Sequence, residues 1–129
     1  SGNPLAMTAG IWCLDQLKPS LYKQLAALGS RLAAGFAEAA RDAGVALQVN
    51  AFGSVLTPFF TNQPVRDYRS ATSADTAQYA RFFNAMLKRG IYPPPSQFEG
   101  WFLSAAHTAR DVDRTIAAAR DAMKDVARG

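Results

Sequence analysis

The pattern of apolar positions is clearest between Pro19 and Ala43. Apolar side chains recur there every three or four residues, which is the period of an α-helix. These positions are Leu21, Leu25, Leu28, Leu32, Phe36 and Ala39. The opposite positions are mostly polar, and Gly44 follows as a helix stop signal. The sequence therefore predicts an amphipathic helix over residues 19–43 with one face in a core.

The first seventeen residues have a different pattern. Asn3 can cap a helix and Pro4 suits a first helical position. Apolar residues then run almost without interruption from Leu5 to Leu14, and no charged residue precedes Asp15. A helix that is apolar on all sides is normally buried on all sides. We therefore expect a disordered segment, or one that docks on a partner.

A β-hairpin is predicted in the stretch from Ala43 to Pro64, which contains no charged residue. Val45, Leu47 and Val49 alternate with polar or small residues, and a second apolar run, "VLTPFF", follows a tight connection at 52–54. Pro58 cannot donate a hydrogen bond to a ladder, so its strand should lie at an edge or carry a bulge. Residues 62–73 read as a surface loop.

Two further helices are predicted from capping patterns. Thr72 with Asp75 predicts a helix that ends at Gly90, and Thr108 with Asp111 predicts a last helix. The predicted inward residues are Tyr79, Phe82, Phe83, Met86 and Leu87 in one and Val112, Ile116, Ala119, Met123 and Val126 in the other. A strand is predicted around 101–104. The resulting fold class is α+β, with a small antiparallel sheet of about three strands and helices packed on one face.

Length and charge narrow the range of functions. A chain of 129 residues predicts one domain. The formal net charge is +4, but the cations are scattered, so we expect no nucleic-acid partner. No apolar run is long enough to span a membrane, so we expect no membrane partner. The single cysteine, Cys13, excludes an internal disulfide. These observations suggest a cytoplasmic protein.

Few groups with catalytic or metal-binding chemistry are present. One histidine and one cysteine do not form a zinc signature, so no metal site is expected. No phosphate-binding glycine loop and no nucleophile elbow occurs. His107 precedes a predicted helix cap, which favours a structural or local hydrogen-bonding role over that of a catalytic base. Cys13 is interpreted as an inert packing residue.

Glu99 is the only formally charged residue between Arg89 and Arg110. It follows three consecutive prolines and precedes the apolar run "GWFLS". Strand alternation would place it on the same side as Trp101 and Leu103. A carboxylate in that setting needs a partner or a shifted pKa. A local structural role and a functional role both remain open at this point.

Several longer motifs resemble those of the glutamate-1-semialdehyde 2,1-aminomutases. They are "SGNPLAMTAG", "VNAFGSVLTPFFT", "VRDYRSA" and "YARFFNAMLKRGIYPPPSQFE", followed by "GWFLSAAHT". The resemblance covers the whole chain in order and spacing, and "PSQFE" with "FLSAAHT" is its most specific part. Gly100 stands where an alanine is common in the family.

The resemblance implies a pyridoxal-phosphate enzyme of the aspartate-aminotransferase fold type, close to the class III aminotransferases. Such an enzyme isomerises glutamate-1-semialdehyde to 5-aminolevulinate by intramolecular amino transfer, for tetrapyrrole (porphyrin) biosynthesis, and is a cytoplasmic homodimer. This chain resembles its C-terminal small domain. Residues 1–17 would then be a helix packed on the missing large domain, and 18–129 the small domain itself.

The resemblance also implies where the functional groups lie. None of the four lysines, Lys18, Lys23, Lys88 and Lys124, matches the lysine that binds the cofactor, which would lie upstream. No catalytic residue is therefore expected in this chain, which should be inactive alone and bind no pyridoxal phosphate. Glu99 is expected to contact the substrate or active site, and Ser1, Gly2 and Asn3 to lie near the cofactor phosphate of the neighbouring subunit.

Two alternatives remain open on the sequence. One is a part of another class III aminotransferase that acts on a different amino acid. The other is a free-standing interaction module.

Overall fold

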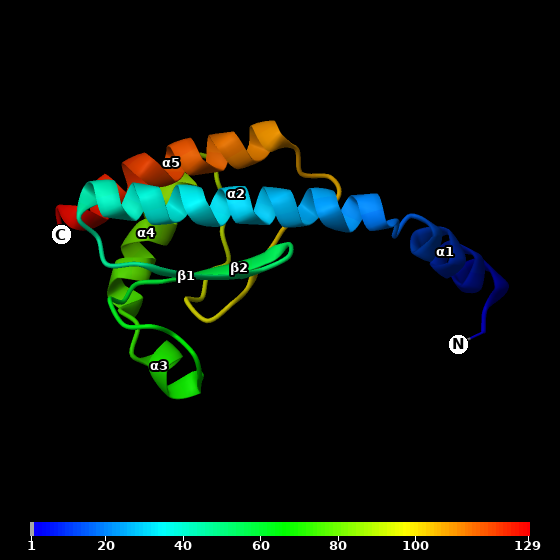
Figure 1. Ribbon diagram of the computed structural model, residues 1–129, viewed down its shortest axis with the longest axis horizontal. Helices are drawn as coiled ribbons and strands as arrows, with labels where there is room; N and C mark the ends of the chain where they lie inside the picture. Colours follow the sequence, from blue (N-terminus) through cyan, green and yellow to red (C-terminus); the bar gives the residue numbers. More distant parts are fainter. Residues whose placement is uncertain (1) are drawn as a thin grey trace.

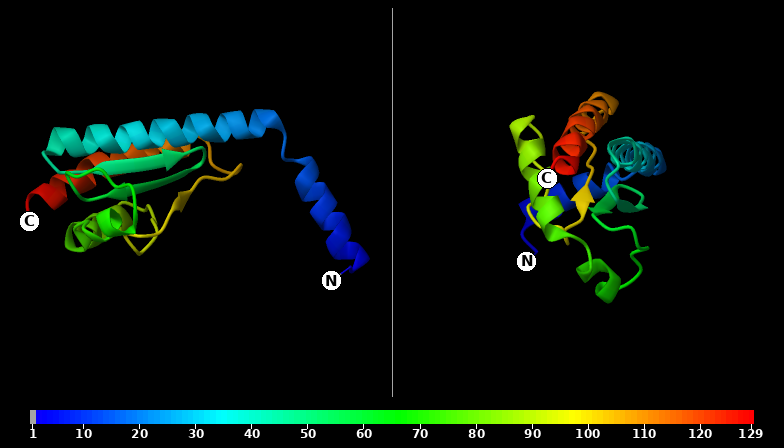
Figure 2. Two further views of the ribbon diagram at one scale, coloured as in Figure 1. Left: turned by 60° about the horizontal axis from the view of Figure 1, so that its bottom comes forward. Right: turned by 90° about the vertical axis from the view of Figure 1, so that its left-hand side faces the viewer.

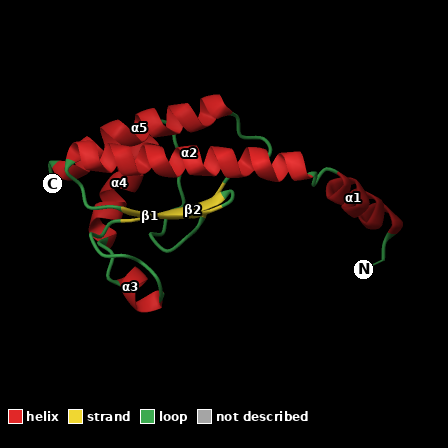
Figure 3. Cartoon of the chain, in the orientation of Figure 1, coloured by secondary structure: helices red, strands yellow, loops and turns green. Residues whose placement is uncertain are grey.

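A small antiparallel sheet lies beneath a layer of helices, and a separate helix projects from one end (Figures 1 and 2). The computed structural model describes residues 2–129. The helices are α1 (Pro4–Asp15), α2 (Pro19–Ala43), α3 (Tyr68–Thr72), α4 (Thr76–Lys88) and α5 (Ala109–Ala127), and the strands are β1 (Gln48–Phe52), β2 (Val55–Phe59) and β3 (Trp101–Phe102) (Figure 3). The predicted α+β class is confirmed.

The sheet has the order β1-β2-β3, with both pairs antiparallel. Gly53, in the left-handed region at φ 57°, makes the tight turn between β1 and β2. The hairpin is confirmed, but β1 begins at Gln48, three residues later than the alternation from Val45 predicts. β2 is the central strand of the sheet, so it is not an edge strand as a whole, but its side toward β3 is unpaired at Pro58, where the sequence predicts an edge or a bulge. β3 pairs only with Val55 and Leu56, and therefore ends before it reaches Pro58.

An aromatic cluster forms the core between the sheet and the helices. Phe36 of α2 and Phe82 of α4 are fully buried. The ring centroid of Phe36 lies 5.1 Å from that of Trp101 on β3, and the centroid of Phe82 lies 5.5 Å from that of Phe60. The predicted inward residues of α5 are all buried. Burial of large aromatic side chains contributes about 1.5–3 kcal/mol each relative to exposure. Since its rings come from both helices and the sheet, the cluster holds the helix layer on the sheet.

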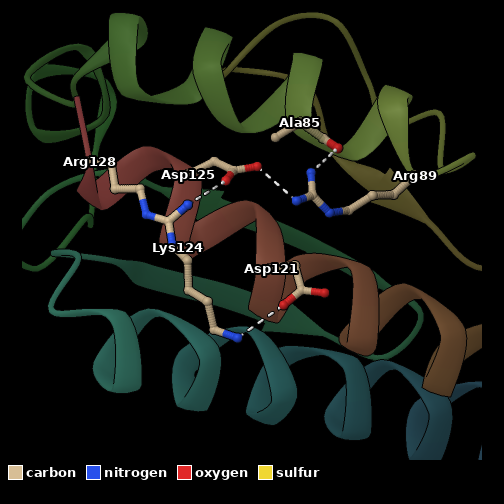
Figure 4. A network of polar contacts seen from close by, with 6 residues as sticks. All are labelled: Ala85, Arg89, Asp121, Lys124, Asp125 and Arg128. Carbon is tan, nitrogen blue, oxygen red and sulfur yellow. Dashed lines mark hydrogen bonds and ion pairs between the residues drawn. The ribbon is translucent and has the colours of Figure 1, made fainter.

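α4 and α5 are also joined by Arg89 (Figure 4). Its Nη1 donates to the carbonyl oxygen of Ala85 at 2.8 Å, and its Nη2 donates to Oδ2 of Asp125 at 2.8 Å. Arg128 lies 3.8 Å from the same carboxylate. The guanidinium thus ties the last turn of α4 to the last turns of α5.

None of the residues of α1 is buried against the rest of the chain. Asn3 caps it, since its Oδ1 accepts from the N–H groups of Leu5 and Ala6. Leu5 is 79% exposed and Trp12 is 65% exposed. The cap and the helix are confirmed. The helix projects away from the sheet and the other helices (Figure 1).

The region between β2 and α4 corrects two predictions. Residues 62–73 are not only a loop, because they include α3. Asp67 and Ser70 form a capping box at the N-terminus of this helix. Asp75, not Thr72, caps α4, and its side chain accepts from the N–H groups of Ala77 and Gln78 at 2.9 Å. The Thr72–Asp75 pattern failed because a serine or aspartate close by in the sequence could serve equally well as the cap. The capping box of Thr108 and Asp111 at α5 is confirmed.

Within residues 2–129, no helix has both the length and the apolar character required to cross a membrane.

Candidate functional site

The proline segment and the start of β3 line a groove of about 430 Å³. Glu99 and His107, the two candidate groups from this part of the sequence, both lie on its wall. The remaining lining residues are mainly apolar or aromatic and include Leu32, Ile91, Tyr92, Pro93, Pro94, Pro95, Trp101, Phe102 and Leu103. A concave, mostly apolar surface with a few polar groups is the usual form of a ligand site.

The proline segment is anchored to α4. Gly90 takes φ 76° and redirects the chain, and Pro93 is buried. The hydroxyl of Tyr79 on α4 donates to the carbonyl oxygen of Pro94 at 2.6 Å. Burial, opposed by the nearby Trp101 indole and assisted by the charge of Glu99, raises the pKa of Tyr79 to about 12. The hydroxyl therefore keeps its proton at neutral pH and can hold the segment throughout.

Gln97 anchors the next part of the segment to β2. Its side chain is 3% exposed. Nε2 donates to the carbonyl oxygen of Pro58 at 2.7 Å, and Oε1 accepts from the N–H of Phe60 at 3.3 Å. Both ends of the amide are therefore used, which removes the cost of burying it.

Glu99 lies in a turn before β3 and is exposed. Its N–H donates to the carbonyl oxygen of Ser96 at 3.2 Å, and its own carbonyl oxygen accepts from Oγ1 of Thr57 at 3.4 Å. Within residues 2–129 its carboxylate makes no hydrogen bond and no ion pair. The backbone is held while the charged group is free.

The expected alternation does not reach Glu99. β3 begins at Trp101, which is buried, and Glu99 precedes it in a turn. The placement of Glu99 on the same side as Trp101 and Leu103 is therefore wrong, because the strand is shorter than the apolar run suggests.

His107 is a local hydrogen-bonding group, as its position before the cap of α5 indicated. Its Nδ1 accepts from the N–H of Ser104 at 3.0 Å and lies 3.2 Å from Oγ of the same serine. The backbone N–H of His107 donates to the carbonyl oxygen of Ser104. The ring thereby closes the turn between β3 and α5 and forms one wall of the groove.

The remaining candidates among the described residues do not line the groove. The side chain of Asn3 is used as the cap of α1 and Gly2 takes φ 86°, while Ser1 lies outside the described residues. The role of these three residues near a cofactor phosphate stays a prediction. Cys13 is exposed on α1, so the packing role expected for it is wrong within this chain. The lysines at 18, 23, 88 and 124 are all exposed.

Sequence reasoning missed Gln97, Thr57 and Tyr79 as supports of the candidate site. Their contacts join segments 15 to 42 residues apart, which no local pattern reports. The available signal for Gln97 was its type, since an amide within an otherwise apolar segment must find partners when it is buried.

Comparison with known proteins shows that the chain is similar to aminomutases and transaminases. No family model matches it. It is 52% identical over 123 residues to a protein from Sorangium cellulosum (strain So ce56) named glutamate-1-semialdehyde 2,1-aminomutase. That match covers 95% of this chain but 28% of the relative. A second protein of the same name is covered over 30% of its length. The chain thus spans less than a third of the curated relatives it matches.

Solved structures show the same fold. An omega-transaminase from Sphaerobacter thermophilus matches with a TM-score of 0.81 and 30% identity, over 99% of this chain and 29% of that protein. A glutamate-1-semialdehyde-aminomutase from Pseudomonas aeruginosa PAO1, in complex with PMP, matches with a TM-score of 0.74 over 85% of this chain and 24% of that protein. Its identity of 19% supports the fold alone. The predicted fold, that of a domain of the transaminases, is confirmed.

Proposed function

We propose that this chain, which belongs by sequence to the glutamate-1-semialdehyde 2,1-aminomutases, is the C-terminal small domain of such an enzyme. The observation that carries the proposal is 52% identity over 95% of the chain to a protein of that name. The complete protein would convert glutamate-1-semialdehyde to 5-aminolevulinate by moving an amino group within one substrate, as a step of tetrapyrrole synthesis.

Pyridoxal 5'-phosphate is the cofactor of the proposed enzyme, and it supplies the electron sink for amino transfer. The residues of this chain do not fit the covalent site of that cofactor. A lysine that binds it must face a closed site, whereas the four lysines here are exposed, and none lines the groove beside Glu99. The cofactor lysine is therefore assigned to the rest of the protein, and this chain alone is expected to be inactive.

Glu99 is the group that this chain contributes to the active site. Its backbone is held by Ser96 and Thr57, and its carboxylate is free at the groove. A carboxylate carried on a backbone held in this way can accept hydrogen bonds from a protonated substrate amine, and no backbone ordering is required on binding. We assign it the role of orienting the amino group of the substrate.

Residues 1–17 are proposed to pack on the large domain of the same protein. Six apolar side chains of this segment are about half exposed or more: Leu5, Met7, Ile11, Trp12, Leu14 and Leu17. A continuous exposed apolar surface of this kind usually marks an interface. The homodimer, the cytoplasmic location, and the position of Ser1, Gly2 and Asn3 near the cofactor phosphate of the neighbouring subunit belong to the same proposal.

The test is an assay of the full-length protein with glutamate-1-semialdehyde as the only substrate. An aminomutase forms 5-aminolevulinate without an added amino acceptor. Transfer of the substrate's amino group to an added keto acid without formation of 5-aminolevulinate, or no reaction at all, would contradict the proposal. The first result would favour an amino transferase like the omega-transaminase that shares 30% identity with this chain.

A second measurement concerns the isolated chain. It is incubated with pyridoxal phosphate and reduced with borohydride, and peptides are then analysed by mass spectrometry. We expect only slow, scattered labelling of exposed lysines. Stoichiometric labelling of one lysine would show a cofactor site within this chain.

A further inference from the structure

The ladder between β2 and β3 stops at Leu56, two residues before Pro58, and the register shows why. The N–H of Leu103 donates to the carbonyl oxygen of Ser54, and Leu56 pairs with Trp101. The same register, continued, would set Pro58 opposite Glu99. In an antiparallel ladder alternate residues direct their backbone groups to the same neighbour. Ser54, Leu56 and Pro58 therefore all face the third strand.

Proline cannot make the bond that this position requires. It has no N–H, so Pro58 cannot donate to the carbonyl oxygen of Glu99. The ladder is therefore broken at the pair that would hold Glu99. The carbonyl oxygen of Glu99 instead accepts from Thr57 at 3.4 Å, and its N–H donates to Ser96 at 3.2 Å.

The break decides where the Glu99 side chain lies. Residues directly opposite in a ladder share a face of the sheet. Pro58 is buried beside Leu56 on the core face, so a continued strand would direct Glu99 into the core. The turn leaves it exposed at the groove instead.

Gln97 supplies the bonds that the missing strand would have made. The carbonyl oxygen of Pro58 and the N–H of Phe60 both face the same side of β2. The first accepts from Nε2 of Gln97 at 2.7 Å, and the second donates to Oε1 at 3.3 Å. A side-chain amide carries the same donor and acceptor as a peptide group, so the chain can leave the sheet without unsatisfied buried groups.

We propose that Gln97 is a positioning residue for Glu99. Its amide replaces the strand that Pro58 interrupts, and so fixes the turn that presents the Glu99 carboxylate to the groove. This inference rests on the proposed role of Glu99 in binding the substrate amine.

The test uses the full-length protein with Gln97→Met, Glu99→Gln and the double variant. Methionine fills a similar volume but makes neither hydrogen bond. Misplacement of a reacting-site group by about 1 Å can cost on the order of 100-fold in rate. We therefore expect Gln97→Met to lower kcat by roughly 10- to 100-fold with little change in KM. In the Glu99→Gln background the same change should lower kcat by less than about twofold, because residues that act together are non-additive.

A matched control is Val126→Ala on α5, which opens a cavity in the core away from the groove. It should reduce thermal stability and leave kcat unchanged. If Gln97→Met does not fold, Gln97→Asn replaces it. Asparagine keeps an amide but is too short to reach both partners, so the same non-additivity is expected.

The outcomes separate the two proposals. If Glu99→Gln retains normal kcat, the role assigned to Glu99 fails, and the inference fails with it. If Glu99→Gln is impaired while the Gln97 variant turns over normally, the inference alone is wrong. It is also wrong if the two losses multiply in the double variant, since Gln97 would then act independently of Glu99.

Discussion

Nη2 of Arg89 lies 2.8 Å from Oδ2 of Asp125, and this pair joins the end of α4 to α5. Arg89→Met would remove this contact and the hydrogen bond to the Ala85 carbonyl oxygen while keeping the aliphatic part of the side chain. The two charged side chains are 28% and 41% exposed, so solvent weakens the ion pair. We expect a loss of about 1 kcal/mol in the free energy of unfolding, measured by chemical denaturation.

Arg128→Met is the matched control for that variant. Arg128 approaches the same carboxylate at 3.8 Å but is 79% exposed. Its loss should change stability by less than about 0.5 kcal/mol. Equal effects of the two substitutions would contradict a specific role for the Arg89 bridge.

Gly29 allows α2 to approach the hairpin turn closely. A Cβ at this position would lie within hard contact of the carbonyl oxygen of Gly53. Because the obstacle is backbone, the helix or the turn would have to move, and we expect Gly29→Ala to destabilise the fold by about 1–3 kcal/mol. Thermal melting of the isolated chain measures this loss.

Gly10→Ala controls for the intrinsic effect of replacing a helical glycine. A Cβ at Gly10 meets no atom within 4 Å, and alanine favours helix by roughly 1 kcal/mol over glycine. This variant should not lower the melting temperature. A loss equal to that of Gly29→Ala would show that the close approach at Gly29 is not what limits stability.

Glu99→Gln should have little effect on the stability of the isolated chain, because the carboxylate has no partner among the contacts of the groove wall. We expect a change within about ±0.5 kcal/mol in the free energy of unfolding. In the full-length protein the same change should lower turnover far more than it lowers stability. A large loss of stability with normal turnover would make Glu99 a structural residue.

Acid should weaken the cap of α4. Hydrogen bonds from Gln78, first its backbone N–H and then its side chain, lower the pKa of Asp75 below its ordinary value of 3.8. A lowered folded-state pKa means that the charged form stabilises the fold above pH 3.8 and that this stabilisation is lost as the pH falls through the folded-state pKa.

The measurement is the melting temperature of wild type and Asp75→Asn at neutral pH and at a pH well below 3.8. Asparagine can cap the helix but has no charge to titrate. The wild type should be the more stable protein at neutral pH, and the difference should shrink in acid. A constant difference would show that the Asp75 charge does not contribute.

Cys13 reports whether α1 is covered in the complete protein. It is exposed on α1 in this chain. A maleimide should therefore label it rapidly in the isolated chain and slowly in the full-length protein, with the modified peptide quantified by mass spectrometry. Equal rates would contradict the packing of residues 1–17 on a large domain. Labelling of the full-length protein after denaturation is the control for reagent access.

Much of the fold could be predicted because its signals are local. The period of α2, its stop at Gly44 and the capping box of Thr108 and Asp111 each depend on residues within a few positions of one another. The length of β3 could not be predicted in this way. The run "GWFLS" gives no sign that Pro58, more than forty residues earlier, ends the ladder opposite Glu99.

The candidate site, too, could be predicted from the sequence only in part. Glu99 could be selected from sequence because it is an isolated carboxylate behind a rigid proline segment. Its surroundings could not, since the contacts of Tyr79, Gln97 and Thr57 are all made across the fold.

Pro58 and Gln97 also bear on how the molecule avoids self-association. A central strand that extends beyond its neighbour leaves unpaired backbone groups, which can accept a strand from another molecule. Here Pro58 offers no N–H, and the amide of Gln97 occupies the carbonyl oxygen of Pro58 and the N–H of Phe60. The end of β2 beyond β3 therefore offers no free backbone group for intermolecular strand pairing, so the pair of residues that frees Glu99 also leaves this side of the sheet closed.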